Sequence, residues 1–220
     1  MTRQRNDEQR KREIREAATR CFVRQGYEAR LLDIAREAGL SKGGIYFHYA
    51  TKEALFHDIL DKYATLLEAR WDFEPVADQP ADRTISRLVV AHLRTMQDEP
   101  NEVRLYNLLV AMAAQEEVFR EKLDEIQSIL RNLYKGAIER GITEGVFAPG
   151  DTDALATSVL AYINGLGSLS AASETGRLPV TPELGAEQVL RMLKVRTRAS
   201  SVEFAAPTEF VAADPKKQPN

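Results

Sequence analysis

The stretch from Leu31 to Lys52 reads LLDIAREAGLSKGGIYFHYATK, and it restricts the possible folds more than any other part of the chain. Gly39 suits the left-handed conformation that follows the end of a helix, and Ser41 is a good N-cap for the next helix. Before this turn, four apolar residues recur at spacings that one face of an amphipathic helix can hold: Leu32, Ile34, Ala35 and Ala38. The pattern predicts a helix-turn-helix.

The second helix of this pair, predicted over residues 42–49, begins unusually. Its first turn contains Lys42, Gly43 and Gly44, whereas the helix dipole favours acidic residues at that end. Each internal glycine also costs about 1 kcal/mol relative to alanine. Ile45 and Tyr49 are four residues apart and can anchor the helix to a core, whereas the residues between them divide between the core and the outside.

The next helix repeats the pattern, with Thr51 as N-cap and Lys52 in the first helical position. A helix N-terminus is already an anion-binding site, and a lysine there strengthens it. Glycines let a backbone approach another molecule closely. The lysines and glycines at these helix starts are therefore explained if the starts face the DNA backbone. The alternative is a small core-forming segment with ordinary solvated lysines, which is favoured for any one lysine but explains the set poorly.

Several short motifs occur in this region: Gly26-Tyr27, Asp33-Ile34-Ala35, Ala38-Gly39, the segment 41–49 and the segment 51–55. They resemble the N-terminal domain of TetR-family transcriptional regulators. The resemblance covers about residues 10 to 60, and the motifs occur in the expected order and at nearly the expected spacing.

The resemblance implies an all-α fold with an N-terminal three-helix DNA-binding domain, a fourth helix as connection, and a larger C-terminal helical domain for ligand binding and dimerisation. It also implies phosphate contacts from the positions of Lys42, Tyr46, His48 and Lys52. Together with the helix starts described above, the predicted DNA-binding residues are Arg30, Ser41, Lys42, Gly43, Gly44, Tyr46, His48, Thr51 and Lys52.

The segment before the first helix of the pair departs from the family pattern. Family members usually have a small hydroxyl residue capping this helix, whereas this chain reads Glu28-Ala29-Arg30-Leu31-Leu32. The stretch from Gly26 to Ile34 is also one residue short. Arg30 either replaces the hydroxyl as a phosphate contact or is a solvated loop residue, and the sequence leaves both possibilities open.

The distribution of charge agrees with local DNA contact. The whole chain has a net charge of −3, which argues against a basic coat over the entire surface. Residues 1–52 carry twelve basic and seven acidic side chains, a net of +5, and the remainder carries −8. A basic N-terminal arm either touches the backbone or minor groove or frays without a fixed contact. Its residues are Arg3, Arg5, Arg10, Lys11 and Arg12.

Other motifs are absent or weak. Cys21 is the single cysteine, so no disulfide framework exists, a reducing compartment is expected, and packing is its expected role. The three histidines show no metal-ligand spacing. No phosphate-binding glycine motif or nucleophile elbow occurs, so we expect no enzyme activity, metal or cofactor. The charged N-terminus lacks a signal peptide, and we expect a cytoplasmic protein without a membrane span.

The apolar periodicity divides the chain into domains. We predict a DNA-binding domain over residues 1–52, a connecting helix over 53–74, a regulatory and dimerisation domain over 75–196 and a disordered tail over 197–220. Helices are expected at about 51–71, 82–97, 102–115, 116–139 and 151–174, with a last one beginning at Thr181-Pro182. Gly141, Gly145, Pro149 and Gly150 are expected to break the chain between the helices at 116–139 and 151–174.

The last two helices suggest association between subunits. One is rich in small residues and the other has an apolar side. The resemblance implies that both pair with a second subunit, whereas packing within one chain is the alternative. A twofold dimer would place two reading helices about 34–36 Å apart over a palindromic operator. The predicted interface contains Ala154, Ser158, Ala161, Gly165, Ser168, Ala172, Val189, Met192 and Leu193.

The resemblance also implies a pocket for an unidentified small-molecule effector. The alternative for each candidate is ordinary core packing, because aromatic residues at helical spacing usually pack. The candidates are Trp71, Tyr106, Met112, Phe119, Tyr134, Tyr162 and Asn164.

The sequence therefore predicts a homodimeric DNA-binding regulator, most simply a repressor that a ligand releases from its operator. Two alternatives remain open at this point. One is an activator or a DNA binder that needs no ligand. The other is a helical interaction protein with weakened DNA binding, which the missing cap at Arg30 makes conceivable.

Overall fold

The structure is a computed structural model that describes residues 2–70 and 79–194. Its described residues form helices and no strands, which confirms the predicted all-α class. A short 3-10 turn, Gly26–Glu28, follows the first helix. The helices are α1 (Thr2–Gln25), α2 (Leu31–Glu37), α3 (Lys42–His48), α4 (Lys52–Arg70), α5 (Ala81–Asp98), α6 (Pro100–Ala113), α7 (Glu117–Thr143), α8 (Thr152–Ala172) and α9 (Pro182–Lys194).

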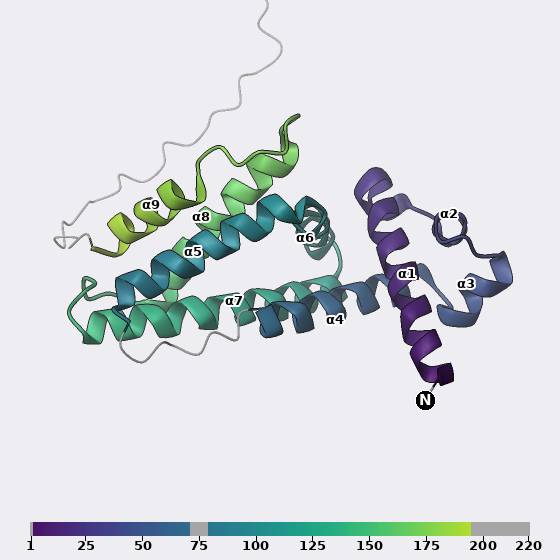
Figure 1. Ribbon diagram of the computed structural model, residues 1–220, viewed down its shortest axis with the longest axis horizontal. Helices are drawn as coiled ribbons and strands as arrows, with labels where there is room; N and C mark the ends of the chain where they lie inside the picture. Colours follow the sequence, from purple (N-terminus) through teal and green to yellow (C-terminus); the bar gives the residue numbers. More distant parts are fainter. Residues whose placement is uncertain (1, 71–78, 195–220) are drawn as a thin grey trace, which may run out of the picture.

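The helices form two groups joined by α4 (Figure 1). Helices α1 to α3 form the head, at one end of the molecule, and helices α5 to α9 form the body. α4 leaves the head and runs alongside α7, while α5 lies between α7 and α9. Trp71 and the predicted tail over 197–220 lie outside the described residues.

The turn between α2 and α3 has the predicted form. Gly39 has a φ of +66°, the left-handed conformation that glycine adopts without strain. Its N–H donates to the carbonyl of Arg36 (3.1 Å), and the N–H of Leu40 donates to the carbonyl of Ala35 (2.8 Å). This pair of bonds is the Schellman arrangement, which satisfies carbonyls at the end of a helix.

One detail of α2 was predicted wrongly. Leu32 is 38% exposed, whereas Leu31 is buried together with Ile34 and Ala35. Positions three and four residues apart share a helix face, and Leu32 lies about 100° round from that face. α2 begins at Leu31, and the preceding Arg30 has an extended backbone and no side-chain capping bond, so the missing cap is confirmed.

An ion-pair network fixes the end of α3 against α1 and α4. The phenol of Tyr49 donates to Asp58 Oδ2 (2.5 Å), and Arg15 Nη1 donates to the same oxygen (3.0 Å). Ile45 and Tyr49 are buried, as predicted. α3 is therefore held in a fixed orientation on the rest of the head.

An aromatic cluster joins the head to the body. The Phe119 ring, from the first turn of α7, lies 5.5 Å from the rings of both Tyr27 and Phe56 and stacks on His57 at 5.4 Å. Phe119 is 1% exposed. The prediction that Phe119 lines an effector pocket is wrong, because α7 inserts this ring between α4 and the loop after α1.

The predicted break at Gly141 is also wrong, because α7 continues to Thr143. Gly141 lies in the helix where the ring of Phe147 folds back on it, and a Cβ there would be 2.1 Å from Phe147 Cδ2. The turn comes at Gly145, another of the predicted breaks, whose φ is +71°. Gly141 therefore lets the Phe147 ring approach α7 closely, and it does not end the helix.

Two of the remaining helices, α8 and α9, begin at a side-chain cap, whereas α5 and α7 begin without one. The Asp151 carboxylate accepts from the N–H groups of Asp153 (3.0 Å) and Ala154 (3.1 Å) at the start of α8. The Thr181 hydroxyl accepts from Leu184 N–H (3.2 Å) at the start of α9. α6 instead begins at Pro100, two residues before its predicted start, because proline suits the first turn of a helix.

Candidate nucleic-acid interface

The first turn of α3 is exposed and uncrowded. The Ser41 hydroxyl accepts from Gly44 N–H (3.1 Å), which is the predicted capping bond. Lys42 and Gly43 are both exposed, and a Cβ placed on Gly43 would meet no atom within 4 Å. Nothing within the protein requires a glycine at position 43, so its presence calls for an external reason.

The start of α4 lies beside this turn in the chain. Thr51 Oγ1 accepts from Ala54 N–H (3.1 Å), which confirms the predicted cap. Lys52 Nζ donates to the Tyr27 carbonyl (2.6 Å) and lies 4.1 Å from the centre of the Tyr27 ring. An ammonium group has three donors, so Lys52 can keep its bond to the Tyr27 carbonyl and still donate to an anion.

His48 is more restricted than the sequence suggested. Its side chain is 11% exposed, and Nδ1 lies 3.4 Å from Oδ1 of Asp7 on α1. The ring also meets the edge of Phe47, with centroids 5.1 Å apart. Asp7 thus ties the outer end of α1 to the end of α3.

The N-terminal arm is part of α1, which begins at Thr2, so of the two alternatives the described residues do not show a frayed end. Three of the arm's basic side chains form ion pairs along α1: Arg10 with Glu13, Lys11 with Asp7 and Arg12 with Glu16. These exposed pairs exchange readily with solvent and other anions.

The outer side of α3 carries two aromatic rings. Tyr46 is 46% exposed and Phe47 is 82% exposed. Phe47 is absent from the predicted DNA-binding set. The signal for it was present in the sequence, because burial of Ile45 and Tyr49 four residues apart turns the positions between them outward.

The outer end of the head therefore brings together most of the predicted DNA-binding residues. α2 and α3 lie at the end of the molecule away from the body (Figure 1). The exposed residues of the set are Arg30, Ser41, Lys42, Gly43, Tyr46 and Thr51; Gly44, His48 and Lys52 are partly buried.

A pocket lies between α4 and the body helices α5 to α8. Tyr106 and Asn164 line it, as predicted, and the Asn164 amide donates to the Tyr106 hydroxyl (3.3 Å). Arg70 forms a two-pronged ion pair with Glu102 in its wall, at 2.9 and 3.2 Å. The lining is Tyr63, Leu67, Arg70, His92, Thr95, Met96, Glu99, Glu102, Val103, Tyr106, Asn107, Leu130 and Asn164.

Three other predicted pocket residues lie elsewhere. Met112 and Tyr134 are buried in the core, and Tyr162 packs partly buried against it. Tyr134 is nevertheless close to the pocket wall, because its hydroxyl lies 3.2 Å from Nδ1 of His92, which lines the pocket. The prediction that Met112 and Tyr162 line this pocket is therefore wrong, since aromatic and apolar periodicity marks core packing equally well.

His92 makes this wall sensitive to pH. It is 5% exposed, and burial, followed by the charge of Arg70, lowers the pKa of His92 to about 4. Between pH 6.5 and about 4 the His92 imidazole is protonated in the unfolded protein but stays neutral in the folded protein. The stability present above pH 6.5 is therefore lost as the pH falls through this window.

We expect the variant His92→Gln to lose less stability on acidification than the wild type. The difference should reach about 2–3 kcal/mol between pH 7 and pH 4.5, because each pKa unit corresponds to about 1.4 kcal/mol. Urea unfolding at the two pH values measures it. Equal losses in both proteins would show that His92 does not carry the dependence.

The small residues of α8 form an exposed stripe. Five of the predicted interface residues are exposed along it: Ala154, Ser158, Ala161, Gly165 and Ala172. Leu169, in the same stripe, is 62% exposed. Ser168 is partly buried and donates to Asn107 of its own chain (2.9 Å).

The predicted contribution of α9 needs correction. Val189 is 0% and Leu193 is 1% exposed, because α9 packs this side against α5 of the same chain. They are therefore unavailable to a partner. Met192 is exposed, as is Leu184 eight residues earlier on the same face.

α8 also meets the length and hydropathy of a membrane span, although none was expected from the sequence. It contacts α5, α6 and α7, and seven of its residues are buried among them, as in the core helix of a helical bundle. Among the described residues, no group of His, Cys, Asp and Glu side chains is arranged to hold a metal ion.

Comparison with known proteins agrees with this arrangement. Residues 14–59 match the model of bacterial regulatory proteins of the tetR family, and residues 81–197 match that of the C-terminal part of BetI-type transcriptional repressors. The two matched segments correspond to the head with the start of α4, and to the body.

Individual relatives are more distant. An uncharacterised HTH-type transcriptional regulator of Bacillus subtilis, YhgD, is 29% identical over 69% of this chain and 78% of its own length. The transcriptional repressor KstR2 of Rhodococcus jostii is 26% identical over 63% of this chain and 68% of its own. These similar proteins are transcriptional regulators.

Solved structures share the fold. A transcriptional regulator from Saccharomonospora viridis, crystallised with choline, superposes with a TM-score of 0.72 at 24% identity, covering 84% of this chain and 95% of that one. A tetR-family protein from Rhodococcus RHA1 gives 0.69 at 25% identity, covering 85% and 98%. The chain belongs to the TetR family and is a DNA-binding transcriptional regulator.

Proposed function

We propose that the protein is a homodimeric repressor that a small-molecule effector releases from a palindromic operator. The single observation that carries the proposal is α4, which begins at Lys52 beside the DNA-facing turn and ends at Arg70 in the pocket wall. Its 19 residues span about 28 Å at 1.5 Å per residue. Movement of one end of this helix changes the position of the other.

The DNA side of the proposal uses the exposed outer end of the head. Lys42 and the free N–H groups at the start of α3 meet phosphate, and Gly43 lets the backbone approach the duplex closely. Tyr46, Thr51 and Lys52 add contacts to the DNA backbone on either side of the first turn of α3. Arg30 is exposed at the start of α2 and extends the contact at its leading edge.

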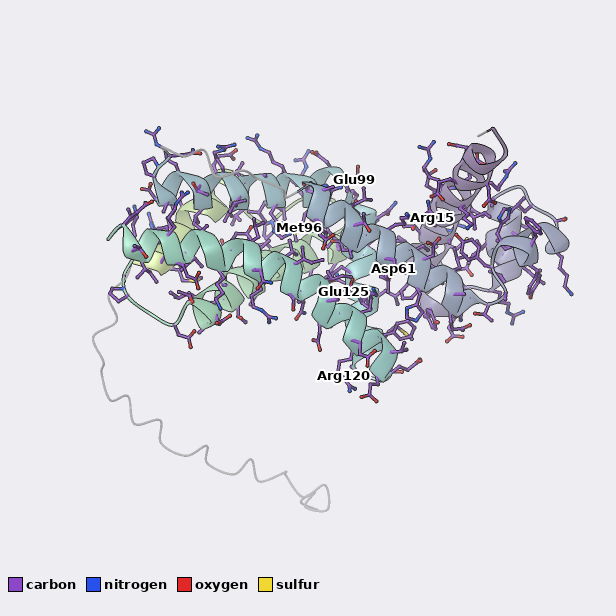
Figure 2. The ribbon with its side chains drawn as sticks, turned by 90° about the horizontal axis from the view of Figure 1, so that it is seen from below. Arg15, Asp61, Met96, Glu99, Arg120 and Glu125 are labelled. Carbon is purple, nitrogen blue, oxygen red and sulfur yellow. The ribbon has the colours of Figure 1, made fainter. Side chains whose placement is uncertain are left out.

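Contacts between the head, α4 and α7 support coupling to the body. Lys122 of α7 pairs with Asp61 of α4 (2.6 Å) and with Glu125 of its own helix (2.5 Å). Figure 2 shows Asp61 and Glu125 next to each other on these neighbouring helices. The Phe119 ring packs against Phe56 of α4. A shift of α4 against α7 therefore changes the position of the head relative to the body.

The pocket supports a two-state mechanism. Its free volume is about 20 Å³, close to the space of a single water molecule. An effector must therefore displace side chains such as those of Arg70 and Glu102 to enter. A ligand that binds only the opened arrangement shifts the equilibrium toward it by that difference in affinity.

A dimer through the exposed stripe of α8 completes the proposal. Small side chains let two copies of a helix approach closely, and the exposed Leu169 and Met192 would become buried there. A twofold axis would place the two heads over half-sites about 34–36 Å apart. Residues 1–52 would then read DNA, 53–74 connect and 75–196 regulate, in the cytoplasm where the operator lies.

The test measures binding to the DNA upstream of the protein's own gene, with and without candidate effectors. Choline is the first compound to try, because a structural neighbour was crystallised with it, followed by a panel of small cations, carboxylates and neutral metabolites. The proposal expects one-to-one binding of dimer to duplex and release by one compound. Binding that no compound in a broad panel alters would instead favour a ligand-independent regulator, and stimulation of transcription by the bound protein would favour an activator.

A further inference from the structure

The most exposed large apolar side chain of the described residues lies on the reading helix. Phe47 of α3 is 82% exposed, and the next in order is Leu169 of α8, at 62%. Burying a phenylalanine side chain is favourable, so an aromatic ring left in water at a binding surface indicates a partner. Single exposed apolar residues are otherwise common on protein surfaces.

The ring of Phe47 has one neighbouring ring. It meets the ring of His48 edge-on at 5.1 Å, and His48 in turn lies 3.4 Å from Asp7 of α1. Because α3 is also anchored through the buried Ile45 and Tyr49, the exposed ring has little freedom to fold back onto the head. An aromatic side chain has only two rotatable torsions and therefore loses little conformational entropy on binding.

The chemistry of phenylalanine limits what this ring can recognise. It has no hydrogen-bond donor or acceptor, so it cannot read the polar edge of a base or bind a phosphate oxygen as Tyr46 can. The major groove offers one apolar group that identifies a base, the C5-methyl of thymine. An apolar side chain beside that methyl gains by removing both surfaces from water.

We propose that Phe47 is a specificity-determining residue that recognises the C5-methyl group of a thymine in each half-site of the operator. This inference rests on the proposed operator binding by a dimer and adds to it the base chemistry that one position of α3 selects. Loss of the methyl should cost about fourfold in affinity per half-site, the effect of exposing one apolar carbon group, and about fifteenfold for both.

The experiment first selects operators from a random pool of DNA duplexes with four full-length proteins: the wild type, Phe47→Ala, Phe47→Leu and Leu66→Ala. Leu66 is 52% exposed on α4, outside the reading helix, and its variant is the matched control for loss of an exposed apolar side chain. Melting curves of the four proteins should coincide, because both substituted side chains are largely in water.

The wild type should select thymine at a symmetric pair of positions. Phe47→Ala should lose that preference and keep the rest of the consensus, whereas Phe47→Leu and Leu66→Ala should keep it. Deoxyuridine, which lacks the methyl, is then placed at the pair. It should weaken wild-type binding about fifteenfold and leave the affinity of Phe47→Ala unchanged.

Two results would overturn the inference. If Phe47→Ala selects the same thymines as the wild type, or if deoxyuridine weakens both proteins equally, Phe47 does not read the methyl, although the proposed regulator stands. If the wild type enriches no common sequence at all, the operator-binding proposal itself fails and the inference with it.

Discussion

Replacing Gly43 by alanine should stabilise the free protein and weaken its binding to DNA. Alanine is favoured over glycine in a helix by up to about 1 kcal/mol, and the added Cβ would meet no protein atom within 4 Å. On DNA the same methyl would stand between the backbone of α3 and the duplex. One obstructed contact costs about 1–3 kcal/mol, comparable to one mismatched base pair, and a dimer makes it twice.

The measurement pairs thermal unfolding of the free protein with operator affinity at one fixed salt concentration. Gly136→Ala is the control, because Gly136 lies on the exposed side of α7 with no atom within 4 Å of its added Cβ. It should raise stability without changing affinity. An unchanged affinity for Gly43→Ala would mean that no close approach to DNA explains this glycine.

Replacing Gly141 by alanine should destabilise the fold. The new Cβ would lie 2.1 Å from Cδ2 and 2.3 Å from Cε2 of Phe147, a ring that is 3% exposed. The Phe147 ring cannot make room for the methyl without leaving the core. Overpacking of this kind costs about 1–3 kcal/mol, sometimes more, so chemical denaturation should show a lower midpoint.

Two comparisons separate this clash from a general effect of alanine in α7. Gly136→Ala, on the same helix, should shift stability in the opposite direction. The double variant Gly141→Ala with Phe147→Leu should recover part of the loss beyond the cost of Phe147→Leu alone, because the smaller side chain makes room for the methyl. A wild-type midpoint for Gly141→Ala would contradict the packing described here.

The local features of the head could be predicted from the sequence because neighbouring residues determine them. The Gly39 turn and the caps at Ser41 and Thr51 depend on side chains within a few positions of the groups they bond. The error at Leu32 has the same origin. Because no capping hydroxyl marks the first residue of α2, the sequence did not determine that residue to better than one position. A shift of one residue rotates a helix face by about 100°.

The pocket and the joint between head and body could not be predicted in this way. Phe119 and Tyr106 are both aromatic residues at helical spacing, yet the first packs on the head and the second lines the pocket. Which of them meets a cavity depends on how α4, α6 and α7 pack together. The ion pair of Arg70 with Glu102 joins residues 32 positions apart and leaves no local signal.

The same limit explains the error on α9. Val189 and Met192 belong to one amphipathic helix, and the sequence shows only that it has an apolar side. Packing of α9 against α5 decides that Val189 is buried within the chain and that Met192 stays exposed. Long-range packing therefore separates a core face from an interface, although both are apolar.

The salt dependence of operator binding tests most directly whether the start of α3 meets the DNA backbone. Lys42 is exposed in that turn, and one such lysine per head should neutralise one phosphate. The affinity of Lys42→Ala should be lower than that of the wild type, and its slope of log K against log salt should be shallower by about 2 for the dimer, since each phosphate contact contributes about 0.9. An affinity and slope equal to those of the wild type would contradict the proposed role of this turn.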